Sequence, residues 1–207
     1  MYGPRKNKLI YWFFSFYIAR SIKRDFYTFQ FNAVETHPDQ AILLLANHSS
    51  WWDGFLLFRL NQLLFKRKFH IMVSEENYRK VAFLKYLGAF SVKKGSKDML
   101  ETLDYAGELL KDKNNLVVIF PQGKLYSSHV TQVDFERGLL RLAQSAGKKF
   151  QYVLAALFTD YFEHRKPGIT VYLHNWQAEE FTSLQLIKNA YNKHYERSRQ
   201  QQCVKIV

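Results

Sequence analysis

The stretch LVVIFPQG, residues 116–123, decides the fold: a wholly apolar run ends in a turn of Pro, Gln and Gly. A second run, YVLAALF at 152–158, is also nearly all apolar. Strands have this composition when both faces of their sheet are covered, as they are in parallel sheets flanked by helices. The two stretches therefore predict central strands of an α/β fold.

Further patterns extend this prediction along the chain. Other short β-rich runs lie at 26–31, 41–45, 70–73 and 169–173. Apolar residues at three- and four-residue spacings predict helices at 53–65, 76–87, 96–111, 134–146 and 183–199. Strands that alternate with helices predict a central, mostly parallel sheet flanked by helices. Because no Gly-, Ser- or Pro-rich linker divides the chain, we expect residues 26–207 to form a single α/β domain.

Composition limits the possible functions but does not identify one. The 207 residues include 30 Lys and Arg against 18 Asp and Glu, a formal net charge of +12. Such a surplus favours anionic partners, whether phospholipid, a phosphorylated substrate or nucleic acid. The single cysteine, Cys203, excludes an intrachain disulfide framework and a Cys-rich metal site, so we expect a reducing compartment.

Residues 1–25 differ from the rest of the chain. The apolar run Leu9–Ala19 has 11 residues, about 16 Å as a helix, and is too short for a hydrocarbon core of about 30 Å. Its flanks contain six basic residues, and its aromatic rings favour the headgroup layer. We expect an interfacial helical segment that associates with a membrane. A helix that simply packs on the domain is the alternative.

Polar residues follow two of the predicted strands, where the loops of an α/β sheet converge. Asn47 and His48 follow the first strand and Asp53 comes five residues after His48; Phe120, Pro121, Gln122 and Gly123 end the other. A carboxylate on one imidazole nitrogen leaves the other nitrogen as a proton acceptor, which suits a general base acting on an alcohol. The alternative is that Asp53 merely caps the next helix.

Together the two motifs resemble the glycerolipid acyltransferase family, which includes lysophospholipid acyltransferases of the 1-acylglycerol-3-phosphate type. The family's first block is Asn-His followed by Asp, and its third is Phe-Pro-Glu-Gly. The resemblance covers roughly residues 41–158, with LGAFSVKK at 87–94 as the second block. It implies that His48 is the general base and that Asp53 orients it. Substrate-binding positions implied by the blocks are Asn47, Gly54, Lys93, Lys94, Phe120, Pro121, Gln122, Gly123 and Lys124.

The departures from the family concern the acceptor. Gln122 stands where the family has Glu and loses the charge, while Lys93, Lys94 and Lys124 stand where arginines commonly contact the acceptor's phosphate. Lysine binds phosphate as a point charge and cannot grip it bidentately. A lysophospholipid remains the expected acceptor, and another lipid alcohol, such as a glycolipid or a glycosylated terpenoid, is the alternative.

The resemblance implies acyl-CoA or acyl carrier protein as co-substrate and no further cofactor. We expect no metal, because no His-Glu-x-x-His or paired Cys spacing occurs. Nine basic residues against two acids between Asn61 and Lys97, including Lys66, Arg67 and Lys68, suggest an anionic membrane or carrier-protein face. We expect a peripheral or monotopic protein on the cytoplasmic face of a membrane and no nucleic-acid partner. A non-catalytic basic protein that binds membrane or nucleic acid is the rival interpretation.

Overall fold

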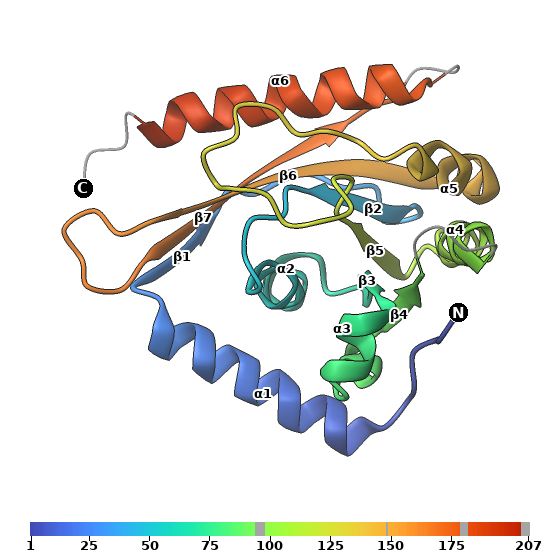
Figure 1. Cartoon of the computed structure of the whole chain (residues 1–207), viewed down its shortest axis with the longest axis horizontal. Helices are drawn as coiled ribbons and strands as arrows, with labels where there is room; N and C mark the ends of the chain where they lie inside the picture. Colours follow the sequence, from blue (N-terminus) through green and yellow to red (C-terminus); the bar gives the residue numbers. More distant parts are fainter. Residues whose placement is uncertain (94–97, 148, 179–181, 204–207) are drawn as a thin grey trace.

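The computed structural model describes residues 1–93, 98–147, 149–178 and 182–203, and its centre is a seven-stranded sheet between two layers of helices (Figure 1). In sheet order the strands are β1 (Thr28–Phe31), β7 (Gly168–Trp176), β6 (Phe150–Asp160), β2 (Ala41–Ala46), β5 (Asn115–Ile119), β3 (Lys68–Ser74) and β4 (Ala89–Val92). The α-helices are α1 (Lys8–Asp25), α2 (Asp53–Leu60), α3 (Glu75–Lys80), α4 (Asp98–Leu109), α5 (Gly138–Ala146) and α6 (Leu184–Cys203).

The sheet is mostly parallel, as predicted. Strands β6, β2, β5, β3 and β4 run in one direction; β7 pairs antiparallel with β6, and β1 pairs parallel with β7. Strand β2 lies between β5 and β6, with Leu45 opposite Ile119 and Ala46 opposite Ala155. Strands β2 and β5 therefore end at the same edge of the sheet, while β6 continues beyond it.

Strand β2 shows why the central strands are apolar throughout. All six of its residues are buried, and alternate side chains enter different cores. Ile42, Leu44 and Ala46 pack on the side of α1 and α2, whereas Leu43 and Leu45 pack on the side of α4, α5 and α6. A strand with a core on each face has no solvated side on which polar residues could alternate.

One predicted helix is wrong, and one strand was missed, between residues 76 and 92. The helix predicted over 76–87 is interrupted: α3 ends at Lys80, and a short 3₁₀ helix, Leu84–Leu87, follows. Gly88 then turns the chain with a φ of 96°, and a Cβ atom there would lie 1.9 Å from the Phe69 carbonyl oxygen. This turn starts β4, a strand that the sequence analysis did not identify.

Other helix boundaries differ from the prediction as well. Helix α2 ends at Leu60, and the remainder of the segment predicted as helical, Asn61–Phe65, forms a π-helical turn that ends at Lys66 with a φ of 54°. Helix α5 begins at Gly138, several residues later than predicted, because a long loop follows β5. The late start of α5 leaves a long loop at the carboxyl end of β5.

Helix α1 packs one face on the domain and leaves the other exposed. Asn7 caps the start of the helix, and its side chain accepts a hydrogen bond from the Ile10 amide. Ile18 and Ile22 are buried in the core beside α2. The opposite face exposes the large apolar side chains Leu9, Trp12, Phe13, Phe16 and Tyr17. Among the described residues, no helix is long and apolar enough to cross a bilayer.

Candidate active site

The two polar junctions predicted from the sequence are hydrogen-bonded to each other. They follow β2 and β5, which are neighbouring parallel strands. The backbone amide of His48 donates to Gln122 Oε1 over 2.6 Å, and the amide of Tyr126 donates to the His48 carbonyl over 3.0 Å. Gln122 is buried, so this bond is shielded from water. The first and third blocks therefore form one structural unit at the edge of the sheet.

His48 and Asp53 form a directly bonded pair. His48 Nδ1 lies 2.9 Å from Asp53 Oδ2, and because a carboxylate can only accept, Nδ1 carries the proton. The same oxygen accepts the backbone amides of Ser49 and Ser50, each over 2.8 Å. Asp53 is only 2% exposed. These bonds hold the carboxylate in place, and its bond with Nδ1 fixes the imidazole tautomer, which leaves Nε2 as the acceptor nitrogen.

The alternative role for Asp53, as a simple helix cap, does not match the geometry. Asp53 is the first residue of α2, and its carboxylate reaches back to the loop that precedes the helix. No side-chain capping bond is made at the Trp52 cap position. Asp53 therefore holds the loop that carries His48, and it does not cap α2.

A second contact orients the imidazole ring. The His48 ring stacks on Phe120 at the end of β5, with a centroid separation of 4.1 Å and an interplanar angle of 12°. Stacking limits rotation of the ring, while the bond to Asp53 sets which edge points outward. His48 remains partly exposed, so Nε2 can meet a substrate from solvent or lipid.

Asn47, a predicted site residue, is buried next to His48 and contacts Leu157 and Tyr191, which the sequence analysis did not assign to the site. Asn47 is buried and pairs with the Leu157 backbone in both directions: its Nδ2 donates to the Leu157 carbonyl over 2.9 Å, and its Oδ1 accepts the Leu157 amide over 2.8 Å. The Tyr191 hydroxyl of α6 donates to the Ala155 carbonyl over 2.7 Å and lies 3.5 Å from Asn47 Oδ1. Asn47 therefore joins β2 to β6 directly.

Nothing in the local sequence marked Tyr191. It lies in a helical pattern at a position where an aromatic side chain predicts core packing, and it is fully buried. Burial raises the pKa of its phenol well above the usual 10, which keeps the hydroxyl a donor. Its contact with Asn47 joins residues 144 positions apart, a relationship that only the fold creates.

The glycines and proline of the site shape its turns. Gly123 has a φ of 65°, a left-handed value that favours glycine, and its amide closes a turn onto the Phe120 carbonyl over 3.0 Å. Pro121 is buried, and its carbonyl accepts the Glu136 amide over 2.8 Å. A Cβ atom on Gly54 would lie 3.3 Å from Ile71 Cδ1, so glycine lets α2 pack closely on β3.

The predicted phosphate contacts differ in their distance from His48. Lys124 lies two residues after Gln122; it is exposed, with Nζ 5.2 Å from the centre of the Tyr126 ring. Lys93 is exposed just after β4, three strands from β2, or about 14 Å at about 4.8 Å per strand. Lys94 lies outside the described residues. Lys124 is therefore the nearer of the two described lysines to the site.

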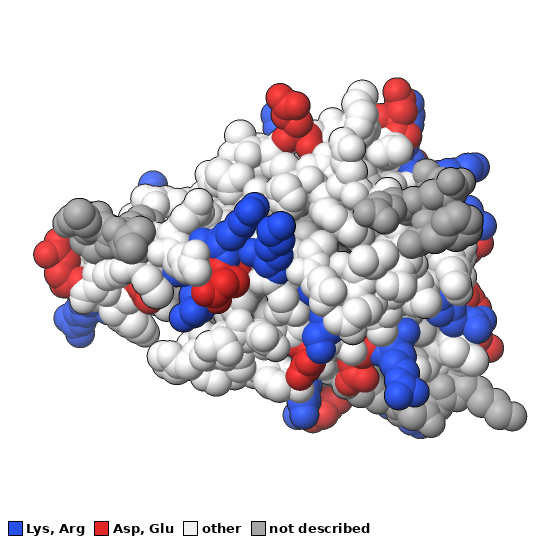
Figure 2. All heavy atoms as spheres, turned by 90° about the horizontal axis from the view of Figure 1, so that it is seen from above, with Lys and Arg blue, Asp and Glu red and all other residues white. Residues whose placement is uncertain are grey.

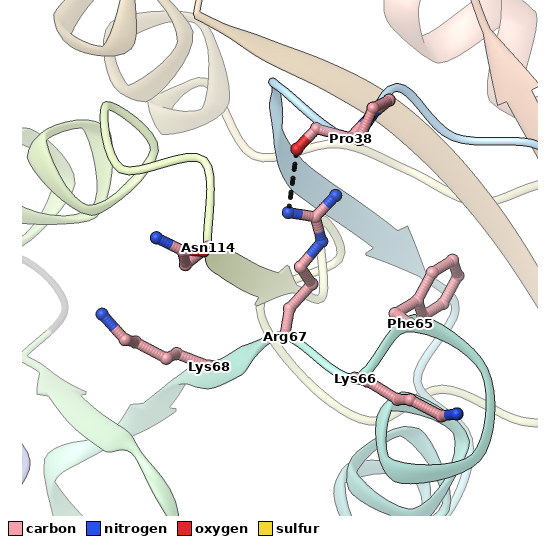
Figure 3. A pocket seen from close by; sticks show the side chains of 6 residues that line it. All are labelled: Pro38, Phe65, Lys66, Arg67, Lys68 and Asn114. Atoms are coloured by element: carbon pink, nitrogen blue, oxygen red, sulfur yellow. Dashed lines mark hydrogen bonds between the residues drawn. The ribbon is translucent and has the colours of Figure 1, made fainter.

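The basic run Lys66, Arg67 and Lys68 lies at the other end of the sheet. These residues line an open depression of about 520 Å³ with Pro38, Phe65 and Asn114, before the start of β3 and β5 (Figure 3). Arg67 donates to the Pro38 carbonyl over 3.2 Å, and Lys68 pairs with Asp112 at 3.2 Å. Strand β5, about 16 Å long, separates this depression from the site.

Charges on the α6 face are also mixed. Lysines and arginines lie among acidic side chains when the molecule is seen from above (Figure 2), and α6 makes the ion pairs Lys188–Asp134 at 2.7 Å and Arg199–Glu196 at 2.9 Å. Within the part of the chain that the structure describes, no group of three metal-ligating side chains comes together.

Together, the layered α/β fold and the joined His-Asp and Phe-Pro-Gln-Gly blocks define a protein of the acyltransferase class. A model of the Acyltransferase family matches residues 28–175, and the chain belongs to this family. Helices α1 and α6 lie outside the matched residues.

The fold is similar to a solved structure, that of the 1-acyl-sn-glycerophosphate (LPA) acyltransferase PlsC from Thermotoga maritima. The two chains are 15% identical with a TM-score of 0.65, over 92% of this chain and 79% of the other. A search of curated proteins returned no significant match.

Proposed function

We propose that this chain transfers a fatty acyl group from a thioester to a hydroxyl of a lysophospholipid of the 1-acylglycerol-3-phosphate type. The observation that carries the proposal is the buried Asp53 carboxylate 2.9 Å from His48 Nδ1, at the carboxyl edge of the sheet. Family membership supports acyl transfer, and the fold shared with a 1-acyl-sn-glycerophosphate acyltransferase supports this acceptor. Acyl-CoA and acyl carrier protein are both candidate donors.

The reaction is a direct displacement in which His48 first accepts and then donates one proton. The acceptor hydroxyl gives its proton to His48 Nε2 as its oxygen bonds to the thioester carbonyl carbon. The tetrahedral intermediate then collapses, the carbon–sulfur bond breaks, and the leaving thiolate takes the proton from the imidazolium. Asp53 stabilises the imidazolium through Nδ1. General-base catalysis of this kind contributes a factor of about 10² to 10⁴.

Lys124 is the first candidate for the acceptor's phosphate, because it is exposed in the loop that Gln122 joins to His48. A glycerol hydroxyl and the phosphate on its neighbouring carbon are only a few bonds apart, which favours a cation close to His48. The second candidate acceptor is a neutral or glycosylated lipid alcohol. It is favoured by lysine at positions where a bidentate arginine grip on phosphate is common.

Membrane association through α1 belongs to the same proposal. On α1, Trp12 and Phe16 are 70% and 61% exposed on the face turned away from the domain. Basic side chains flank this face at Lys8, Arg20 and Lys23. Exposed aromatic rings with basic flanks suit the headgroup layer of an anionic membrane. We place the protein on the cytoplasmic face of such a membrane, as a peripheral or monotopic enzyme that meets its acceptor in the lipid.

The test is an acyl-transfer assay with purified protein and an acyl thioester on each carrier. Lysophosphatidate and a neutral lipid extract serve as acceptors, and free thiol and labelled product are measured together. The His48→Ala variant should lose turnover, and Asp53→Ala should lower kcat more than it weakens donor binding. His37→Ala is the matched control, because His37 is exposed near the opposite end of β2. Full activity in His48→Ala would overturn the mechanism.

A further inference from the structure

The hairpin between β6 and β7 extends beyond the edge of the sheet that carries His48. Ala155 on β6 is opposite Ala46, the last residue of β2, and β6 continues to Asp160. At about 3.3 Å per residue, these additional residues carry the hairpin about 16 Å past the end of β2. Figure 1 shows the hairpin as the long orange arm beside the start of β1.

The tip of this arm exposes two adjacent aromatic side chains. Tyr161 and Phe162 are 59% and 48% exposed. Phe162 has a φ of 45°, which is unusual for a bulky residue in a turn where glycine or asparagine is favoured. A strained aromatic residue that does not contribute to the core suggests a role outside the domain.

The arm is continuous with the carboxyl end of α1. The Tyr27 amide, two residues after α1, donates to the Pro167 carbonyl over 2.9 Å. The exposed Tyr27 ring stacks on His164 in the hairpin with a centroid separation of 3.5 Å. Thr28 then pairs with Gly168 where β1 and β7 begin. The hairpin tip and the exposed face of α1 therefore belong to one connected region.

The charged side chains of the hairpin and of α1 indicate which kind of surface this region binds. Arg165 and Lys166 are exposed on the hairpin, and Arg20, Lys23 and Arg24 are exposed on the last turns of α1. Three acids lie in the same segments: Glu163, Asp160, which accepts a hydrogen bond from Gln202 over 2.7 Å, and Asp25, which Arg24 binds at 2.7 Å. Exposed aromatic rings among a cationic surplus are complementary to the headgroup layer of an anionic bilayer.

We propose that the hairpin tip, Tyr161 and Phe162, is a second membrane contact that enters an anionic headgroup layer together with α1. This inference rests on the proposed membrane association of α1. A single interfacial helix constrains the orientation of the domain less than two separate contacts do. A second contact at the end of the arm adds that constraint and holds the His48 edge of the sheet over the lipid.

The test measures the surroundings of one side chain at a time. In a Cys203→Ser background, which removes the exposed native thiol, three single variants are labelled with an environment-sensitive fluorophore: Phe162→Cys, Phe16→Cys and Leu186→Cys. Leu186 is the matched control, because it is exposed on α6 across the sheet from α1. The probes are phosphatidylcholine vesicles with and without about 30% phosphatidylglycerol.

We expect emission at positions 162 and 16 to shift to the blue and rise about twofold or more on anionic vesicles, with no change at 186. A shift at 16 without one at 162 overturns the hairpin contact and leaves α1 docking intact. A shift at 162 without one at 16 supports the hairpin contact and overturns docking by α1. No shift at either position overturns both, as does an equal change at 186.

Discussion

The backbone amide of His48 donates to the side-chain oxygen of Gln122, so the residue that replaces the family's Glu serves as a structural acceptor between two strands. An amide and a carboxylate oxygen both accept such a bond. The absence of a charge at this position is therefore compatible with an intact loop around His48.

Substitution of Gln122 tests this role. Gln122→Met removes the acceptor and leaves a buried amide unpaired, which costs about 1–3 kcal/mol of stability. We expect kcat to fall about tenfold or more because the His48 loop loses its anchor to β5. Gln122→Glu keeps an acceptor oxygen and should stay within about threefold of the parent kcat. Thermal unfolding and steady-state kinetics measure both quantities, and a Gln122→Met variant with parental kcat would contradict the anchor.

Lysine substitutions test which cation contacts the acceptor. Lys124→Ala should raise KM for a phosphorylated acceptor about tenfold, since charge-assisted contacts contribute about 1.5–3 kcal/mol. Lys93→Ala, at a site three strands from β2, should change KM much less. Acceptor titrations at fixed donor concentration measure the difference. Equal effects in the two variants would mean that the acceptor reaches further along the sheet edge than this geometry supports.

Two tyrosines of α6 form a matched pair. Tyr191 and Tyr195 are both buried and each donates one hydroxyl hydrogen bond, to the Ala155 and Val130 carbonyls respectively. Only Tyr191 also approaches Asn47. Each Tyr→Phe substitution should lower unfolding free energy by about 1 kcal/mol. Only Tyr191→Phe should also lower kcat, by several-fold. An equal fall in kcat for Tyr195→Phe would mean that the loss of stability alone explains the effect.

His194 makes stability depend on pH. Burial lowers its pKa from 6.5 to about 4, although its Nε2 lies 3.0 Å from the Tyr172 carbonyl. The unfolded chain therefore binds a proton at a higher pH than the folded chain does. The stability that comes from keeping His194 neutral is fully present above pH 6.5 and is lost as pH falls toward about 4. The full loss amounts to about 3 kcal/mol of unfolding free energy.

Urea unfolding at pH 7.5, 6 and 5 measures this loss. His194→Gln should flatten the decline in unfolding free energy over that range, while His37→Gln, at an exposed site, should leave it unchanged. An unaltered slope in His194→Gln would mean that other groups cause the pH dependence. His174, which stacks on His194, is one such group, because burial lowers its pKa as well.

Sequence patterns predicted the layers of this fold because a strand that is buried on both faces has a recognisable apolar composition. Apolar runs such as Leu116–Phe120 predicted covered strands, and the polar residues after them predicted a site at the strand ends. The pattern failed over 76–87, where helical spacing continues through a segment that must turn at Gly88 to start β4. Periodicity reports which residues are apolar, and it does not report where packing against Phe69 forces a turn.

By itself, the sequence determined the α/β class and the family blocks, and it singled out His48 and Asp53 as candidate catalytic residues, since these depend on residue type and short spacing. Only the tertiary structure decided which distant groups support them. It brought Tyr191 to Asn47, placed Lys66–Lys68 at the far end of the sheet, and left one face of α1 exposed. These relationships arise when strands and helices pack, because a contact across the fold needs two surfaces whose relative position is not written in either segment alone.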